Sequence, residues 1–270
     1  MNWVYDKLLT MLSIIIPSYK DPYLAPTIQS LLDQAWGKIE VVVVLDGYKP
    51  DIYIEDPRVK YIHQENKGMR EAINVAVANS KGDYIMRTDE HATFGIGYDL
   101  LLTSHIKDNW IVKPRRYKLD VEKWEVMDEP YIDYEKLVID KSHNKFHGVE
   151  WTNRSIERKA FAIDEDMAMQ GSCWVMPRSW WEKTIVRLDS TGYHTHYQDS
   201  IEMLFKTWEA GGKLMLNKKT WHAHKHRKFN RSHNYPSKLA RESWDYALKV
   251  HGDYYKEVIY PRFFGKKYEN

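Results

Sequence analysis

Residues 39–47 read IEVVVVLDG, a run of β-branched residues that ends in an aspartate and a glycine. Uninterrupted apolar runs of this length are typical of strands buried on both faces of a parallel sheet. Three further runs have the same character: LSIIIP at residues 12–17, VKYI at residues 59–62 and DYIM at residues 83–86. Apolar residues at helical spacing follow the first and the third of the four runs along the chain. Strands that alternate with helices predict an α/β protein whose sheet is mainly parallel and flanked by helices.

The composition narrows the class of protein. The chain has 270 residues, 43% of them hydrophobic, which is ample for a large core, and its formal charge of +2 gives no sequence-wide basic field for nucleic acid. Cys173 is the single cysteine, so an intrachain disulfide is excluded and a reducing compartment is indicated. Nothing at the N-terminus resembles a signal peptide, and the apolar run at 11–17 is too short to span a bilayer. We therefore expect a cytoplasmic protein.

Polar residues follow three of the apolar runs. They are Pro-Ser-Tyr at residues 17–19, Asp-Gly at residues 46–47 and Arg-Thr-Asp-Glu-His at residues 87–91. The carboxyl ends of parallel strands meet at one edge of the sheet, and ligands of such sheets bind outside that edge. These three loops are thus predicted to converge on one crevice.

The last of these loops carries a candidate metal site. Asp89 and His91 are two residues apart, so in extended geometry both side chains leave the same face. A carboxylate oxygen and an imidazole nitrogen placed in this way suit Mn²⁺, or Mg²⁺, carrying a diphosphate. The alternative interpretation is an ordinary polar turn that closes a strand.

Four segments of the first hundred residues stand out: SIIIPSY at residues 13–19, SLLDQ at 30–34, the run at 39–47 and Asn-Lys-Gly at 66–68. In their order and spacing they resemble the nucleotide-sugar half of family 2 glycosyltransferases, which adopt the Rossmann-like GT-A fold. No G-x-G-x-x-G follows the first strand, which disfavours a dehydrogenase-type dinucleotide site. The chain has Leu45-Asp46 where the family usually has two aspartates. The resemblance implies a set of donor-binding residues in this half: Pro17, Ser18, Tyr19, Asp46, Asn66, Lys67, Gly68, Arg70 and Arg87.

Three segments stand out in the second half: MQGSCW at residues 169–174, DSIEMLFKTWEAGG at 199–212 and WHAHKHR at 221–227. They are similar to segments of the polypeptide N-acetylgalactosaminyltransferases, whose metal motif is also Asp-x-His. This resemblance implies donor contacts from Gly171, Ser172 and Arg227. It also implies that His224 is a third metal ligand beside Asp89 and His91. No lectin-like repeat follows these segments.

The histidine cluster has other interpretations. His222, His224 and His226 alternate along one segment, and His222 takes the place of His224 if the register is wrong by two residues. The cluster could also be a solvated basic strand or a surface patch for phosphate.

Two carboxylates in the second half are the predicted catalytic residues. Asp199 and Glu202 are three residues apart, so they share a face of any helix that begins at Asp199. Asp199 is predicted either to cap that helix or to remove the proton of an acceptor hydroxyl. Family 2 enzymes invert and the Asp-x-His group retains, so the stereochemistry stays open. In a retaining enzyme Asp199 would bind acceptor or donor hydroxyls instead of removing a proton.

The chain is predicted to form a single catalytic domain with a C-terminal extension. Its parts are a nucleotide-sugar half (residues 1–97), an acceptor and catalytic half (residues 98–227) and a basic segment with a helix (residues 228–270). Within the second part, residues 98–165 match no motif. The basic residues between 225 and 241 suit a segment that closes over a diphosphate, a nucleic-acid contact or solvated charge.

Together these patterns predict a metal-dependent glycosyltransferase that moves a sugar from a nucleotide-diphosphate sugar, with a UDP-sugar as the expected donor, to a hydroxyl. The acceptor could be a glycan, a protein or a modified nucleic acid. Two alternatives remain: a DNA-modifying glycosyltransferase acting on a hydroxymethylated base, and a non-catalytic module that binds nucleotide-sugar or glycan. A nucleotidyltransferase is disfavoured, because no glycine-rich, lysine-bearing loop follows the first strand.

Overall fold

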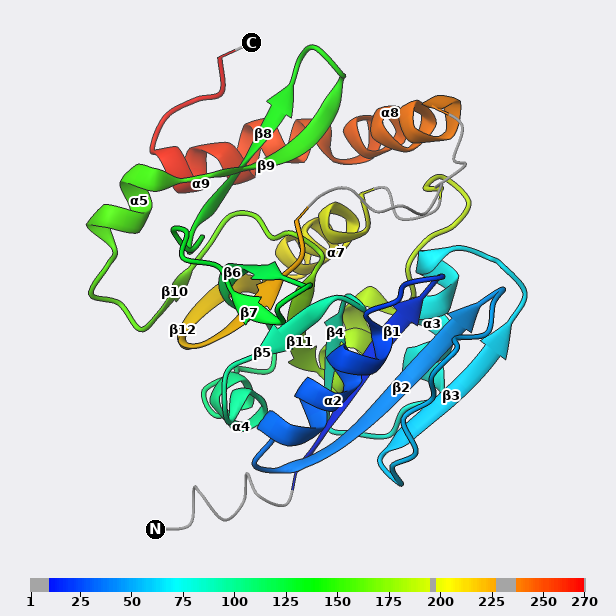
Figure 1. Cartoon of the computed structure of the whole chain (residues 1–270). Coiled ribbons are helices and arrows are strands. Elements are labelled where there is room, and N and C mark those ends of the chain that lie inside the picture. The colour runs from blue at the N-terminus through cyan, green and yellow to red at the C-terminus, as the bar shows by residue number, and fades with distance from the viewer. Residues whose placement is uncertain (1–9, 195–197, 227–236, 270) are drawn as a thin grey trace.

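The computed structural model describes residues 10–194, 198–226 and 237–269, and it is built around one 10-stranded sheet (Figure 1). The strands lie in the order β10-β12-β6-β11-β4-β1-β2-β3, with β5 paired to β12 and β7 paired to β6. Their bounds are β1 Met11–Ser18, β2 Lys38–Asp46, β3 Val59–Gln64, β4 Tyr84–Thr88, β5 Ala92–Phe94, β6 Trp110–Asp120, β7 Glu125–Val126, β10 Ile163–Glu165, β11 Cys173–Pro177 and β12 Lys213–His224. The four strands predicted from the apolar runs are all present.

The direction of the strands changes across the sheet. Strands β1 to β4 are parallel to one another, as predicted from the first hundred residues. Strand β11 then runs antiparallel to both β4 and β6, whereas β6 and β12 are parallel to each other. The sheet is therefore parallel in its N-terminal half and mixed beyond β4. Strands from before and after residue 97 belong to this one sheet. The division of the chain into two halves at residue 97 stays a prediction.

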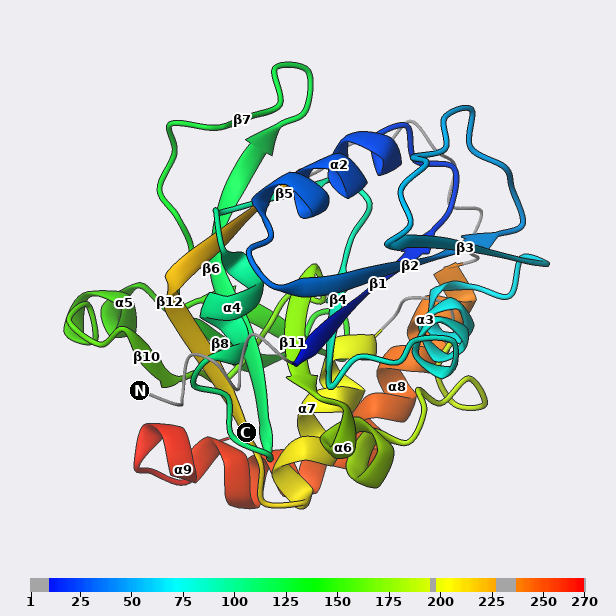
Figure 2. The same ribbon diagram turned by 90° about the horizontal axis from the view of Figure 1, so that it is seen from below.

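Helices cover both faces of the parallel half because its strands are apolar on both sides. Ile14 and Ile16 pack with helix α2 (Leu24–Gln34), whereas Ile15, on the opposite face, packs with helix α3 (Met69–Ala78). Figure 2 shows α2 on one side of the sheet and α3 on the other. Alternation along buried strands thus produces two cores, one on each side of the sheet.

The second half adds helices and a separate hairpin. Its elements are α4 Tyr98–Thr103, β8 Glu135–Asp140, β9 Lys145–Glu150, α5 Thr152–Glu157, α6 Arg178–Trp180, the π-helix η1 Trp181–Ile185, α7 Asp199–Glu209, α8 Ser237–Tyr254, the π-helix η2 Tyr255–Ile259 and α9 Tyr260–Phe264. The hairpin formed by β8 and β9 lies beside α8 (Figure 1). The segment from 98 to 165, which matched no motif, therefore supplies β6 to the main sheet and this hairpin. No helix in the three described ranges is long and apolar enough to cross a membrane.

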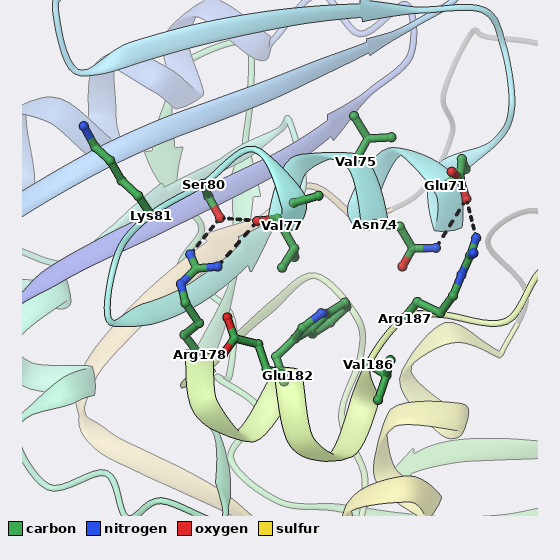
Figure 3. Close-up of a pocket in the computed structure, with 12 residues that line it drawn as sticks. Glu71, Asn74, Val75, Val77, Ser80, Lys81, Arg178, Glu182, Val186 and Arg187 are labelled. Carbon is green, nitrogen blue, oxygen red and sulfur yellow. Dashed lines mark hydrogen bonds and ion pairs between the residues drawn. The ribbon is translucent and has the colours of Figure 1, made fainter.

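A groove of about 580 Å³ lies between α3 and the turn formed by α6 and η1 (Figure 3). Arg187 donates a hydrogen bond of 3.1 Å to the carboxylate of Glu71 on α3. The residue before it, Val186, lines the groove with φ 61° and ψ −57° and is 63% exposed. The backbone N–H of Arg187 donates to the carbonyl of Ile185 at 2.6 Å, which makes the segment a γ-turn centred on a β-branched residue. A positive φ at valine costs roughly 1–3 kcal/mol.

Val186→Gly should raise the stability of the protein, because glycine adopts this φ without a Cβ clash. We expect an increase in Tm of about 2–4 °C, equivalent to about 1 kcal/mol in a chain of this size. Val250→Gly is the matched control, because Val250 is 49% exposed within helix α8, where glycine lowers stability. Calorimetric melting of both variants checks this, and a fall in Tm for both would contradict a strained Val186.

Candidate functional site

Asp89, His91 and His224 lie together at the carboxyl edge of the sheet. Strand β4 ends at Thr88, and after a bend β5 pairs with β12 so that His224 lies opposite Ala92. Asp89 Oδ2 is 2.9 Å from His224 Nε2 and 3.9 Å from His91 Nε2. One ligand atom from each of the three side chains lies within 4.8 Å of the others. Two segments more than 130 residues apart in the chain therefore present three metal-type ligands to one point.

The geometry that joins Asp89 to His91 differs from the prediction. The sequence predicted that both side chains leave one face in extended geometry at the end of a strand, whereas β4 stops at Thr88, and Glu90 and His91 form a bend before β5. It is the bend that turns His91 towards Asp89. His222, the alternative to His224, has its Nε2 within hydrogen-bond distance of Ser172 Oγ, at 3.1 Å. The structure therefore places His224, and not His222, in the three-residue group.

Asp21 orients His91, a role that the sequence argument missed. Its Oδ2 accepts a hydrogen bond of 3.0 Å from His91 Nδ1, and both side chains are buried. With Nδ1 held in this way, Nε2 is the ring nitrogen that faces Asp89. A carboxylate behind a histidine fixes the tautomer and orientation of a metal-binding imidazole. Asp21 and His91 are 70 residues apart, and no sequence motif links them.

The charges at the site favour binding of a cation. Burial raises the pKa of Asp89, but the Arg87 guanidinium and the hydrogen bond from His224 together hold that pKa well below its usual value. Burial lowers the pKa of His224 to about 4, despite the opposing effect of Asp89. Near neutral pH the cluster thus contains an ionised carboxylate and a neutral imidazole. Those are the protonation states that metal ligation requires.

Asp199 is a buried carboxylate that Gly171 and Arg87 connect to the cluster. It is the first residue of α7 and is 8% exposed, and its Oδ2 has no hydrogen-bond partner within the described part of the chain. A Cβ added to Gly171 would lie 3.0 Å from this oxygen and 3.4 Å from Arg87 Nη1. Arg87 in turn donates to Asp89 Oδ1 at 2.6 Å. Gly171 thus leaves room for Asp199 and Arg87 to approach the same place.

Asp199 is not the helix cap that the sequence argument allowed. Gln198, with φ 58°, occupies the N-cap position of α7, and no side chain caps the helix. The carboxylate of Asp199 is therefore not used by the first turn of its own helix.

Two contacts hold the chain at the ends of β1 and β2, one to a carboxylate and one between two hydroxyl groups. Both oxygens of Glu90, in the bend before β5, accept from the backbone N–H of Tyr19, at 3.1 and 3.0 Å. The side-chain hydroxyls of Ser18, which follows Pro17 in β1, and Tyr48 are hydrogen bonded to each other. These contacts fix the edge of the predicted crevice.

Asp46, predicted to contact the nucleotide, makes its contacts within the protein. Its carboxylate accepts from the backbone N–H groups of Lys67 at 2.8 Å and Gly68 at 2.9 Å, and from the Gln64 amide at 2.7 Å. Asp46 is 4% exposed. Its place in the structure is thus to hold the loop that contains Asn66 against the end of β2.

Arg70 and Glu202 form a buried ion pair. The Arg70 guanidinium donates to Glu202 and lies 4.3 Å from the ring centre of Tyr193. Glu202 also accepts from Lys206 at 2.7 Å and from the backbone N–H of Asp189 at 2.9 Å. Arg70 was predicted to contact the donor, and Glu202 was predicted to be a catalytic residue. In the structure the two side chains pair with each other, and this ion pair joins α3 to α7. Arg227, the remaining predicted donor contact, lies outside the described residues.

The comparisons with known proteins agree with this arrangement. The sequence model of the family described as "Glycosyl transferase family 2" matches residues 13–163, which is more than half of the chain. The chain belongs to glycosyl transferase family 2. Similar proteins include the chondroitin synthase of Escherichia coli, 35% identical over 91 residues, covering 31% of this chain and 13% of that protein. Glycosyltransferase GlyG of Streptococcus pneumoniae is 32% identical over 88 residues, covering 29% of each chain. The matches thus span less than a third of either relative.

The fold extends beyond these matches. The structure of GalNAc-T7 with UDP, GalNAc and Mn²⁺ superposes with a TM-score of 0.76 at 18% identity. The superposition covers 93% of this chain and 50% of the other. The predicted GT-A fold is confirmed, and so is the resemblance to both glycosyltransferase groups.

If the Arg70–Glu202 pair is structural, Glu202→Gln should destabilise the protein strongly, because it leaves Arg70 buried without a counter-charge. We expect a loss of about 3–5 kcal/mol in the free energy of unfolding, measured with urea. Glu209→Gln on the same helix is the control, because the Glu209 side chain is 44% exposed and pairs with His251. A loss for Glu202→Gln no larger than that of the control would contradict a structural pair.

Proposed function

We propose that this protein is a metal-dependent glycosyltransferase that transfers a sugar from a nucleotide-diphosphate sugar, specifically a UDP-sugar, to an acceptor hydroxyl. The observation that carries this proposal is the meeting of Asp89, His91 and His224 at one point, together with the buried carboxylate of Asp199, which Gly171 and Arg87 connect to Asp89. Family membership supports the reaction class, and the UDP and Mn²⁺ in the GalNAc-T7 structure support the donor and the ion.

The residues of the cluster fit a divalent ion. One carboxylate and two imidazoles, with Asp21 behind one of them, form a donor set suited to Mn²⁺ that leaves positions for phosphate oxygens. A bound ion would supply positive charge to the diphosphate as it departs. Asp89, His91 and His224 would hold that ion, and Asp21 would keep His91 aimed at it. The loop at 66–68, held by Asp46, would line the nucleotide side of the crevice.

Asp199 is placed to handle the acceptor proton. As the acceptor oxygen forms a bond to the anomeric carbon, the bond from that carbon to the diphosphate oxygen breaks, and its electron pair leaves with the diphosphate. The acceptor hydroxyl loses its proton to the Asp199 carboxylate. Oδ2 of Asp199 is suited to this because no donor within the described residues occupies it. Glu202, paired with Arg70, positions α7 and takes no proton.

The two alternative functions gain no support from a specific contact. A DNA-modifying enzyme was suggested by the basic C-terminal segment, and residues 227–236 of that segment lie outside the described ranges. A non-catalytic module has no use for a group of metal-type ligands together with a buried carboxylate oxygen that lacks a hydrogen-bond partner within the described residues. Hydrolysis of a UDP-sugar by the purified protein, dependent on Mn²⁺, tests the proposal without knowledge of the acceptor.

Asp199→Asn should lower Mn²⁺-dependent hydrolysis of the UDP-sugar by about 10²–10⁴-fold, because the amide cannot accept the proton. The Kd for UDP should change by less than about threefold, a change of under 1 kcal/mol, since the substitution keeps size and shape. Asp253→Asn, at an exposed site on α8, is the control. Turnover by Asp199→Asn at the rate of the control would show that Asp199 is not the base.

Asp21→Asn should weaken Mn²⁺ binding by about 10–100-fold, because a carboxylate behind a histidine raises its basicity and fixes its orientation. Asp51→Asn provides the control, because Asp51 is an exposed aspartate that lines the same hollow as Asp21. Titration of Mn²⁺ in the presence of UDP measures both affinities. Equal affinities in the two variants would remove Asp21 from the site.

A further inference from the structure

A buried cluster of charges lies between β6, the hairpin and the segment before β11. The ammonium group of Lys113 contacts Glu135 at 2.9 Å and Asp166 at 2.6 Å, and it donates to the carbonyl of Ala168 at 2.9 Å. All three charged side chains are less than 10% exposed. Burial raises the pKa of Glu135, but Lys113 and Arg116 lower it to about 2, so this carboxylate is ionised. Nothing in the proposed reaction uses this cluster.

Arg116 joins the cluster to the proposed donor site. It is 7% exposed, and its guanidinium donates to Glu135 Oε1 at 2.8 Å and to the side-chain oxygen of Gln170. The same oxygen of Gln170 accepts from Ser172 Oγ at 3.3 Å. One planar guanidinium thus reaches an acid on the hairpin and an amide on the glycine-containing segment at the same time.

The segment from Gln170 to Ser172 is fixed from both sides. The carbonyl of Ser172 accepts a hydrogen bond of 3.1 Å from the backbone N–H of Asp89, the carboxylate of the metal cluster. Between the two ends, Gly171 lies against Asp199 and Arg87. A shift of Gln170 would therefore move the backbone that lies against Asp199 and Arg87 and that is hydrogen bonded to Asp89.

We propose that Arg116, acting through Gln170, is a positioning residue that holds residues 170–172 in place for the donor diphosphate and its ion. The inference rests on the proposed function for its ligand, and it assigns a role to the hairpin segment that no motif had revealed. Glu135 on β8 fixes Arg116, Arg116 fixes Gln170, and the glycine-containing segment lies in its bound position before the donor arrives. Pre-organisation of this kind increases affinity by removing the cost of ordering the segment.

The test compares two adjacent arginines. Arg116→Lys keeps the charge next to Glu135, but one ammonium cannot reach Glu135 and Gln170 in the same planar arrangement. Arg115→Lys is the matched control, because Arg115 donates bonds of 2.7 and 2.8 Å to the single carboxylate of Asp133 and, within the described part of the chain, makes no hydrogen bond to Gln170. Gln170→Met removes the acceptor and leaves every ion pair intact, so it decides the question even if Arg116→Lys folds poorly. Gln170→Glu restores an acceptor for Arg116 and serves as the rescue.

Calorimetry with UDP and Mn²⁺ gives the first readout. The Kd for UDP should rise about tenfold in Arg116→Lys and Gln170→Met, and stay within about threefold of wild type in Arg115→Lys and Gln170→Glu. In UDP-sugar hydrolysis the same two variants should raise KM and leave kcat within about threefold, because the loss is in ground-state binding.

Hydrogen exchange of residues 169–173 in the ligand-free protein gives the second readout. Exchange should accelerate about tenfold in Arg116→Lys and Gln170→Met, and not in Arg115→Lys. If the wild-type protein binds UDP with Mn²⁺ and Gln170→Met changes neither Kd nor exchange, the positioning role is overturned and the proposed function stands. If the wild-type protein fails to bind UDP with Mn²⁺, the proposed function fails. Faster exchange in Gln170→Met would then still support the contact.

Discussion

The site depends on the pairing of β5 with β12. β5 is only three residues long, yet its antiparallel register with β12 places His224 opposite Ala92 and next to Asp89. The backbone N–H of Lys225 adds a bond of 3.1 Å to the carbonyl of His91, so the pairing continues one step beyond the strand. These bonds bring together in space two parts of the cluster that are far apart in the sequence. Binding of one ion by all three side chains would in turn stabilise the pairing, because it favours only the assembled form.

Acidic and basic side chains alternate through the site. Asp21 faces His91, and Asp89 faces both His224 and the Arg87 guanidinium. Arg87 also faces Gly171, which has no side chain that could separate it from Asp199. Burial would penalise each of these groups alone, but a neighbour of complementary charge or hydrogen-bonding character offsets the cost for most of them. Asp199 Oδ2 lacks a hydrogen-bond partner within the described residues, as do Arg87 Nε and His224 Nδ1. Among those residues, however, no contact offsets the burial of the Asp199 charge in the way that Asp89 offsets that of Arg87. A buried group left in that state is a reason to assign it to chemistry instead of stability.

The sequence predicted the parts of this protein that follow from local pattern. Runs such as residues 39–47 predicted buried strands because β-branched residues on both faces have few other stable arrangements. The polar residues after those strands predicted where the three loops meet, because the carboxyl ends of parallel strands lie at one edge of the sheet. Long-range side-chain contacts were not accessible in this way. Nothing in the local pattern shows that Glu202 pairs with Arg70, that Asp46 holds the loop at 66–68, or that Arg116 reaches Gln170. Each of these joins residues that only the completed fold brings together.

The central claim is that Asp89, His91 and His224, from two distant segments, bind one ion. Pulsed electron paramagnetic resonance of bound Mn²⁺ tests this directly, because a coordinated imidazole nitrogen couples to the metal spin and can be counted. In the wild-type protein with Mn²⁺ and UDP we predict two coupled histidine nitrogens, with one remaining in either His91→Ala or His224→Ala. A wild-type spectrum without histidine coupling, in a protein that still binds Mn²⁺ with UDP, would contradict the assignment of the metal site.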